Sequence, residues 1–329
     1  MVAPLIALAL AMTPTPHLKV SGWLVFFDNG ESLATFEKHA DQLDTVGVEW
    51  TGCDPAGHSI RRDRPTAAEK KKVLRIARKH GVKVLGIAAN AANGDFTPAG
   101  VEKALASEKA MRRHASELTK IAIEDGLDGI DLDYESLRAV DRAPFTRFVA
   151  ILSKSLHARK LTLAIALHPK MSEPGNWDGS QAQDFAALGR LCDIVRVMTY
   201  DEHWLTSDAG PVASPAWVEQ VMRFASSVIP ASKLDMGIPA YGYDWVGKQA
   251  TSFTWADLGR LSLAHGRPTR DPASQELTLR YDNHTAFFAD GPAQRSKLQL
   301  AKKLRLHGVA MWRLGSEDPS VWTEFRKGK

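Results

Sequence analysis

Eight apolar, strand-like runs separated by helical segments constrain the fold of this 329-residue chain more than any other feature. They span residues 18–27, 45–50, 82–90, 129–135, 160–167, 193–201, 233–242 and 308–315. Between them, apolar residues recur at helical spacing, as in Phe145, Phe148, Val149, Leu152 and Leu156. Alternating strands and helices indicate parallel strands joined by crossovers, and eight such units close a barrel. The sequence therefore predicts an α/β fold, a (β/α)8 TIM barrel over residues 18–329.

An open doubly wound sheet is the alternative. Such a sheet usually has fewer strands and a glycine-rich phosphate turn after the first strand. The segment FFDNGESL at 26–33 is not such a turn, so the barrel is favoured.

The connection at 244–291 is too long for a simple crossover. It contains a helical stretch followed by the alternating pieces ELTLRY and HTAFFA. This pattern predicts a small α+β insertion between strand seven and helix seven, walling one side of a cleft.

The first 17 residues, MVAPLIALALAMTPTPH, differ from the rest of the chain. A short apolar run reaches Ala9-Leu10-Ala11 and is followed by threonine and proline, as in a secretory signal peptide, although the usual basic start is absent. A disordered N-terminus or a misplaced start codon is the alternative. If the segment is a signal, the protein acts outside the cytoplasm, secreted or periplasmic. No later stretch approaches the ~18 apolar residues of a membrane span.

The charge balance favours no polyanionic partner. The chain has 42 basic and 38 acidic residues, a net charge of +4, and its densest basic segment, 69–81, has the apolar spacing of a solvated helix. No nucleic-acid partner is expected. No Cys/His spacing fits a zinc site, so no metal or cofactor is predicted, and a monomer is expected.

The two cysteines are predicted to be unpaired. Cys53 follows strand two, at the mouth of the predicted barrel, whereas Cys192 precedes strand six, at its bottom. A disulfide needs Cα atoms within about 7 Å, which this placement denies.

The stretch DGIDLDYES at 128–136 carries the strongest functional signal. Residues two apart on a strand share a face, so Asp131, Asp133 and Glu135 are predicted to point into the barrel. Each two-residue step is roughly 6.5 Å, which brings Glu135 to the C-terminal mouth, where barrel enzymes hold their active sites. Asp128 has the opposite parity and is the weakest candidate of the four acids.

Stacked carboxyls in a poorly solvated site push one another's pKa values apart. One group then keeps its proton near neutrality, as general acid catalysis requires. A solvated acidic turn is disfavoured by the interleaved Ile130 and Leu132. A calcium loop is disfavoured because 135–140 lacks the glycine such a loop needs.

These residues resemble a known family. DGIDLDYE is similar to the D-x-x-D-x-D-x-E signature on the fourth strand of glycoside hydrolase family 18. VMTYD at 197–201 resembles the family's sixth-strand motif, and Trp312 in AMWRLGSEDPSVW resembles its eighth-strand tryptophan. GPVASPAWVEQVM and GIPAYGYDW are similar to the bacterial branch that includes spore-cortex lytic N-acetylglucosaminidases.

The resemblance implies hydrolysis of β-linked N-acetylglucosamine glycans, peptidoglycan or chitin-like, with retention and with assistance from the substrate. It implies that Glu135 is the general acid and base, and that Asp133 orients the N-acetyl group and stabilises an oxazolinium. Asp131 would help to move the charge and proton of Asp133. Tyr200 would donate a hydrogen bond to the acetamido oxygen.

Further residues are predicted to bind substrate. Trp312 is expected to form the floor under the sugar at the cleavage site. The other candidates lie at the ends of strands three, six and seven or in the loops that follow; they are Asn90, Asp201, Trp204, Tyr241 and Trp245. His168, which ends strand five, is typical of a structural residue.

Two other functions stay open at this point. One is a catalytically silent barrel that only binds N-acetylated glycans, although such relatives usually lose the acid or its aspartate partner. The other is an enzyme on a different β-linked sugar, or a transglycosylase. Tyr200 and Asp133 argue for a substrate with an acetamido group.

Overall fold

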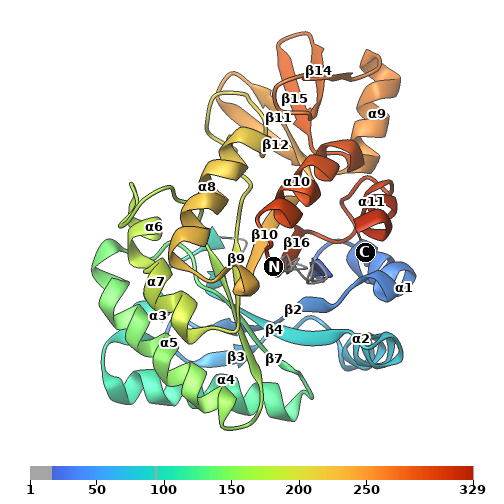
Figure 1. Ribbon diagram of the computed structural model, residues 1–329. Helices are drawn as coiled ribbons and strands as arrows, with labels where there is room; N and C mark the ends of the chain where they lie inside the picture. Colours follow the sequence, from blue (N-terminus) through green and yellow to red (C-terminus); the bar gives the residue numbers. More distant parts are fainter. Residues whose placement is uncertain (1–16, 93–94, 329) are drawn as a thin grey trace, which may run out of the picture.

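A computed structural model of the chain describes residues 17–92 and 95–328. Its centre is a closed ring of eight parallel strands (Figure 1). In ring order these are β1 (Lys19–Leu24), β2 (Thr45–Cys53), β4 (Lys83–Ala89), β7 (Gly129–Asp133), β8 (Thr162–Leu167), β9 (Ile194–Val197), β10 (Leu234–Pro239) and β16 (Gly308–Trp312). Strand β1 pairs with both β2 and β16, which closes the ring. Each predicted run overlaps one of these strands, although β2 extends three residues beyond its predicted end, and the predicted TIM barrel is confirmed.

Helices connect the strands and cover the outside of the barrel (Figure 1). They are α1 (Glu31–His39), α2 (Ala67–His80), α3 (Ala99–Leu105), α4 (Glu108–Glu124), α5 (Arg142–His157), α6 (Asp178–Ala182), α7 (Phe185–Leu191), α8 (Pro215–Val228), α10 (Gly291–Lys303) and α11 (Val321–Gly328). Local sequence sets their ends: Thr66 and Glu69 form a capping box at the start of α2, and Gly81 ends it at a φ of 71°.

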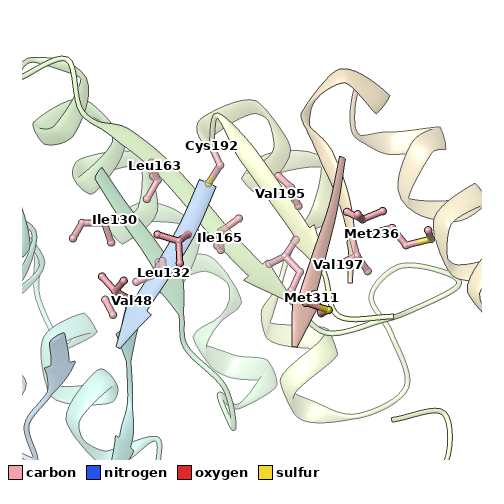
Figure 2. Close-up of a cluster of buried hydrophobic side chains, with 14 of the residues drawn as sticks. Val48, Ile130, Leu132, Leu163, Ile165, Cys192, Val195, Val197, Met236 and Met311 are labelled. Carbon is pink, nitrogen blue, oxygen red and sulfur yellow. The ribbon is translucent and has the colours of Figure 1, made fainter. Parts of the chain in front are cut away.

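The main hydrophobic core lies between the outer face of the barrel and these helices. Figure 2 shows part of it, including Ile130 and Leu132 of β7 with side chains from neighbouring strands. The predicted stripe of α5 is fully buried against the same core. Each such side chain stabilises the fold by roughly 1.5–3 kcal/mol. Because alternate residues of β7 are used in this way, its aspartates are directed to the inside.

The insertion forms a second, smaller sheet above one side of the barrel (Figure 1). Five antiparallel strands run in the order β12 (Gln249–Phe253), β11 (Gly242–Val246), β15 (His284–Phe288), β14 (Leu277–Tyr281) and β13 (Thr269–Arg270). Helix α9 (Trp255–His265) packs on this sheet through Leu258. The predicted helix and strand pieces are therefore present, although the first strand begins two residues before the predicted boundary. The short strand β3 (Ser59–Arg61) pairs with β2, whereas β5 (Ala91–Ala92) and β6 (Asp95–Phe96) form a separate two-stranded sheet.

Three further predictions concern the chain as a whole. Cys53 and Cys192 are both free. Across residues 17–92 and 95–328, no helix combines the length and the apolar character needed to cross a membrane. The predicted signal segment lies outside the described residues, apart from His17.

Candidate active site

The site begins with Asp131, deep inside the barrel and fully buried. Its Oδ2 atom accepts a hydrogen bond of 2.9 Å from Nε1 of Trp23 on β1 and another from Arg196 on β9. Among the described residues, its Oδ1 atom is buried without a hydrogen-bond partner, as is Oδ1 of Asp133. Each of these two buried carboxyls therefore has an oxygen left for a further interaction.

Asp133 and Glu135 continue this face toward the mouth, and both are held in their protonated forms more tightly than free carboxyls. Burial, followed by the charges of Asp131 and Glu49, raises the pKa of Asp133 to about 7. Burial, Asp133 and Asp201 raise the pKa of Glu135 well above its ordinary value. Glu135 is the more open of the two, with 23% of its side chain exposed. A protonated carboxyl at the mouth above an ionisable one is the arrangement that general acid catalysis needs.

Asn90 fixes the backbone that carries Glu135. Its Oδ1 atom accepts from the Glu135 N–H at 2.9 Å, and its Nδ2 atom donates to the Glu135 carbonyl at 2.8 Å and to that of Thr97 at 2.7 Å. Asn90 is almost wholly buried. The predicted contact with a sugar hydroxyl needs correction, because the amide is already committed to protein partners. Asn90 is a positioning residue for Glu135.

Tyrosine hydroxyls surround a further acid at the rim. Tyr241 and Tyr243 both donate to Oδ1 of Asp201, the second at 3.0 Å. Asp201 is open to solvent as a residue, but its carboxyl lies within the cleft wall, and burial there raises its pKa against the opposing effect of the two hydroxyls. Burial and the nearby Asp133 and Glu135 raise the pKa of Tyr200 well above its usual range, so Tyr200 keeps its proton as a donor.

Trp312 ends β16 beside these groups. Its ring packs edge-on against Trp23, with centroids 5.8 Å apart. A cavity of about 320 Å³ is lined by Trp312, Asp201, Tyr241 and Tyr243 together with residues of the insertion, which are Ser252, Phe253, Thr254 and Asp257. The predicted binding residues from strands six, seven and eight therefore line one cavity, and the insertion supplies its other wall.

The two other predicted tryptophans differ from each other. Trp204 is 51% exposed in the loop after β9, where a sugar could reach it. Trp245 is only 1% exposed, so its predicted role as a wall of the substrate site is wrong. It lies on β11, packs against Tyr243 and Phe287, and donates from Nε1 to the carbonyl of Trp204 at 3.2 Å. Trp245 thus supports the loop of Trp204 from behind.

Several residues of the site were missed at the level of the sequence. Trp23 and Arg196 reach Asp131, and Glu49 adds a charge near Asp133, with its own pKa raised by burial. Arg196 shares the strand face of Tyr200, so alternation along VRVMTYD could have identified it. A Cβ on Gly47 would lie 2.7 Å from the Trp23 ring and 3.1 Å from Asp131, which explains the glycine there.

Asp128, the weakest catalytic candidate of the four acids, has a structural role. Its Oδ2 atom accepts from the backbone N–H of Val84 at 2.8 Å, which joins β4 to the start of β7. Within the described parts of the chain, no group of three or more His, Cys, Asp or Glu side chains could hold a metal ion. The carboxyl and hydroxyl groups gathered in the site can transfer protons and stabilise charge.

Comparison with known proteins agrees with this chemistry. The family model described as "Glycosyl hydrolases family 18" matches residues 23–318. The chain is 28% identical to the "Uncharacterized glycosylase YvbX" of Bacillus subtilis, over 98% of this chain and 96% of that protein. It is 31% identical to the "Cortical fragment-lytic enzyme" of the same organism, over 66% of this chain and 53% of the relative.

Solved structures share the architecture. A chitinase from Chromobacterium violaceum superposes with a TM-score of 0.87 at 25% identity, covering 94% of this chain and 98% of that one. The spore cortex-lytic enzyme SleL of Bacillus cereus gives a TM-score of 0.85 at 21% identity, over 94% and 74% of the two chains, and supports the fold alone.

Proposed function

Because the chain belongs to glycosyl hydrolase family 18 and is a glycoside hydrolase, we propose that it cleaves β-linked N-acetylglucosamine glycans with Glu135 as general acid and base. The observation that carries this proposal is the stack of Asp131, Asp133 and Glu135 on one inner strand face. In it, burial and mutual repulsion raise the pKa values of the outer two. That stack supplies a proton at the mouth near neutral pH.

The proposed reaction uses the substrate's own acetamido group as the nucleophile. Glu135 gives its proton to the glycosidic oxygen while the acetamido oxygen attacks C1. Asp133 accepts a hydrogen bond from the acetamido N–H and stabilises the positive oxazolinium that forms. The Tyr200 hydroxyl donates to the acetamido oxygen and holds it in line. Glu135 then takes a proton from the water that opens the ring, and the anomeric configuration is retained.

Asp131 has a narrower part in this scheme than its neighbours. Its ion pair with Arg196 balances its charge inside the barrel. The free Oδ1 atom still allows it to share a proton with Asp133 when the latter turns toward substrate. Trp312, Asp201, Tyr241 and Trp204 would bind the sugars around this centre.

The glycan itself is proposed to be peptidoglycan or a chitin-like polymer outside the cytoplasm. The relatives include cortical fragment-lytic enzymes and chitinases, which supports both substrates. All steps of the proposed mechanism involve the acetamido group, so a substrate lacking it should not be cleaved.

Product analysis by mass spectrometry tests the proposal. Purified peptidoglycan and an N-acetylglucosamine oligomer would each be incubated with the wild-type protein, with Glu135→Gln, and with the surface control Glu219→Gln. Cleavage by wild type and control, and none by Glu135→Gln, is the expected result.

A de-N-acetylated oligomer provides the second comparison. Cleavage of that oligomer at a similar rate would contradict assistance by the substrate. Glycan binding by wild type without cleavage of any of the three substrates would instead support a silent binding barrel.

A further inference from the structure

His168, at the end of β8, lies beside the proposed catalytic acid. Its Nε2 atom is 3.7 Å from Oε2 of Glu135, and the imidazole is 9% exposed. Among the described residues this nitrogen is buried and has no hydrogen-bond partner. A buried ring nitrogen directed at a functional carboxyl, with no other partner, calls for an explanation.

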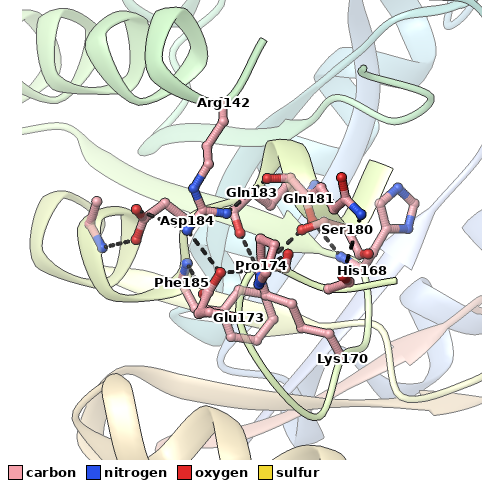
Figure 3. Close-up of polar contacts among 12 residues, drawn as sticks. Arg142, His168, Lys170, Glu173, Pro174, Ser180, Gln181, Gln183, Asp184 and Phe185 are labelled. Atoms are coloured by element: carbon pink, nitrogen blue, oxygen red, sulfur yellow. Dashed lines mark hydrogen bonds and ion pairs between the residues drawn. The ribbon is translucent and has the colours of Figure 1, made fainter. Parts of the chain in front are cut away.

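The position of His168 is fixed by a polar cluster around Lys170, shown in Figure 3. The Nζ atom of Lys170 is nearly inaccessible and donates to Glu173 and to the carbonyls of Pro174, Ser180 and Gln183. Oε1 of Gln183 in turn accepts from the backbone N–H of His168 at 2.7 Å. The loop after β8 is therefore tied to one buried ammonium group, which sets where the imidazole stands.

The ring itself is held by contact rather than by hydrogen bonds. Trp177 packs edge-on against it, with centroids 4.5 Å apart. Burial lowers the pKa of His168 to about 4, so the imidazole is neutral at the pH where Glu135 would act. The titratable groups near Glu135 are Asp133 from β7, Tyr200 and Asp201 from the segment after β9, and His168. Of these, His168 brings a neutral ring nitrogen that is buried and has no other partner among the described residues.

We propose that His168 is a positioning residue for Glu135. Each time Glu135 has given up its proton, the Nε2–H of His168 donates a hydrogen bond to the resulting carboxylate. This inference rests on the proposed function. The 3.7 Å between Nε2 of His168 and Oε2 of Glu135 is longer than a hydrogen bond. Such a distance is expected while Glu135 is protonated and directed at substrate. A movement of the carboxylate by about 1 Å completes the bond.

The proton count of the step is simple. Glu135 transfers its proton to the leaving oxygen and becomes a carboxylate, while His168 keeps its own proton and only donates a hydrogen bond. When Glu135 takes a proton from the attacking water, that bond is released. No charge appears on the imidazole at any stage.

The test compares four proteins: wild type, His168→Leu, His168→Gln and the control His157→Gln, which changes an exposed histidine of α5. A hydrogen bond to its charged form lowers the pKa of Glu135, so its removal should raise that pKa. Because Glu135 must be protonated to act, the alkaline limb of kcat/KM for an N-acetylglucosamine oligomer should move up by about one pH unit in His168→Leu. The value of kcat should fall about tenfold, with KM nearly unchanged. The side-chain amide of His168→Gln should restore the limb.

A measurement without substrate separates this inference from the proposed function. Proteins labelled with ¹³C in the glutamate carboxyls would be titrated by NMR, with Glu135→Gln assigning the signal. A higher pKa of Glu135 in His168→Leu, reversed in His168→Gln, is expected whether or not the oligomer is cleaved. An unchanged Glu135 titration in His168→Leu, or a reduced kcat with an unmoved alkaline limb, would overturn the inference.

Discussion

The guanidinium of Arg196 and the carboxylate of Asp131 form an ion pair inside the barrel, and neither side chain reaches solvent. The same guanidinium lies 5.4 Å from the Trp23 ring, and its Nε atom is 3.6 Å from Oδ2 of Asp235. Nδ1 of His307 bonds the other oxygen of Asp235 at 2.7 Å. These groups form a chain of contacts inside the barrel, from Asp131 on β7 through Arg196 on β9 and Asp235 on β10 to His307, just before β16.

Removal of the cation from this chain should destabilise the protein strongly. Arg196→Met leaves Asp131 and Asp235 buried without it, and breaking a buried pair in this way costs about 3–5 kcal/mol. Arg196→Lys keeps a charge and should cost less. The free energy of unfolding in urea measures both, with the exposed Arg190→Met as control. A loss below about 1 kcal/mol for Arg196→Met would show that the pair is not needed for folding.

The contribution of Asp133 to stability should fall as the pH rises from about 4 to 7. The pKa of Asp133 is about 7 in the folded protein and about 3.9 in an unfolded chain, so the folded state binds this proton more tightly. The stability contributed by the protonated form is complete below the unfolded pKa and is lost as the pH rises through the folded pKa.

Asp133→Asn removes this dependence. The variant should be inactive, and at pH 8 its free energy of unfolding should exceed that of wild type by at least about 1 kcal/mol. Near pH 4 the two should be similar. Urea unfolding across this range, with the exposed Asp208→Asn for comparison, measures the difference. A variant less stable than wild type at pH 8 would contradict the raised pKa.

Asn90→Ala should reduce activity even though the Asn90 side chain binds the protein backbone and not the substrate. The change leaves the Glu135 N–H and carbonyl without their side-chain partners, which costs about 1–3 kcal/mol of stability and frees the backbone of the acid. We expect kcat to fall with KM nearly constant, measured on the oligomer against the turn variant Asn283→Ala. A rise in KM alone would restore the original prediction of a sugar contact.

Trp312→Ala should act mainly on binding. Loss of an aromatic floor for the sugar removes buried apolar contact worth about 1.5–3 kcal/mol, so KM should rise about tenfold or more, and Trp312→Phe should lie between. Trp217→Ala, on the outer helix α8, removes a ring of equal size that packs against the core. Trp217→Ala should lower stability and leave KM unchanged. Equal KM values for the two alanine variants would argue against Trp312 as the floor under the sugar.

The barrel and the acidic face were predictable because both depend on periodicity. Strand alternation decides which way Asp131, Asp133 and Glu135 point, and that period is visible in the sequence. The same period could have identified Arg196. Strand periodicity does not reveal which groups from other strands will contact these three acids.

Trp245, Asn90 and His168 illustrate that limit. Trp245 was expected to line the cleft. Because β11 pairs with both β12 and β15, Trp245 is instead buried within the insertion. The part played by Asn90 depends on two backbone bonds that form only when β4 lies beside β7. His168 resembles an ordinary core residue in the sequence, and only its distance to Glu135 distinguishes it.

Contacts between charged groups link the bottom of the barrel, at His307, to its interior at Asp131. His307 is 28% exposed there, and its bond to Asp235 raises its pKa, so it keeps its proton to a higher pH than a free imidazole does. A proton gained or lost by His307 changes the net charge of the group formed by His307, Asp235, Arg196 and Asp131. Substitution of His307 would therefore alter the charge at one end of this chain of contacts while every residue that lines the cavity stays as it is.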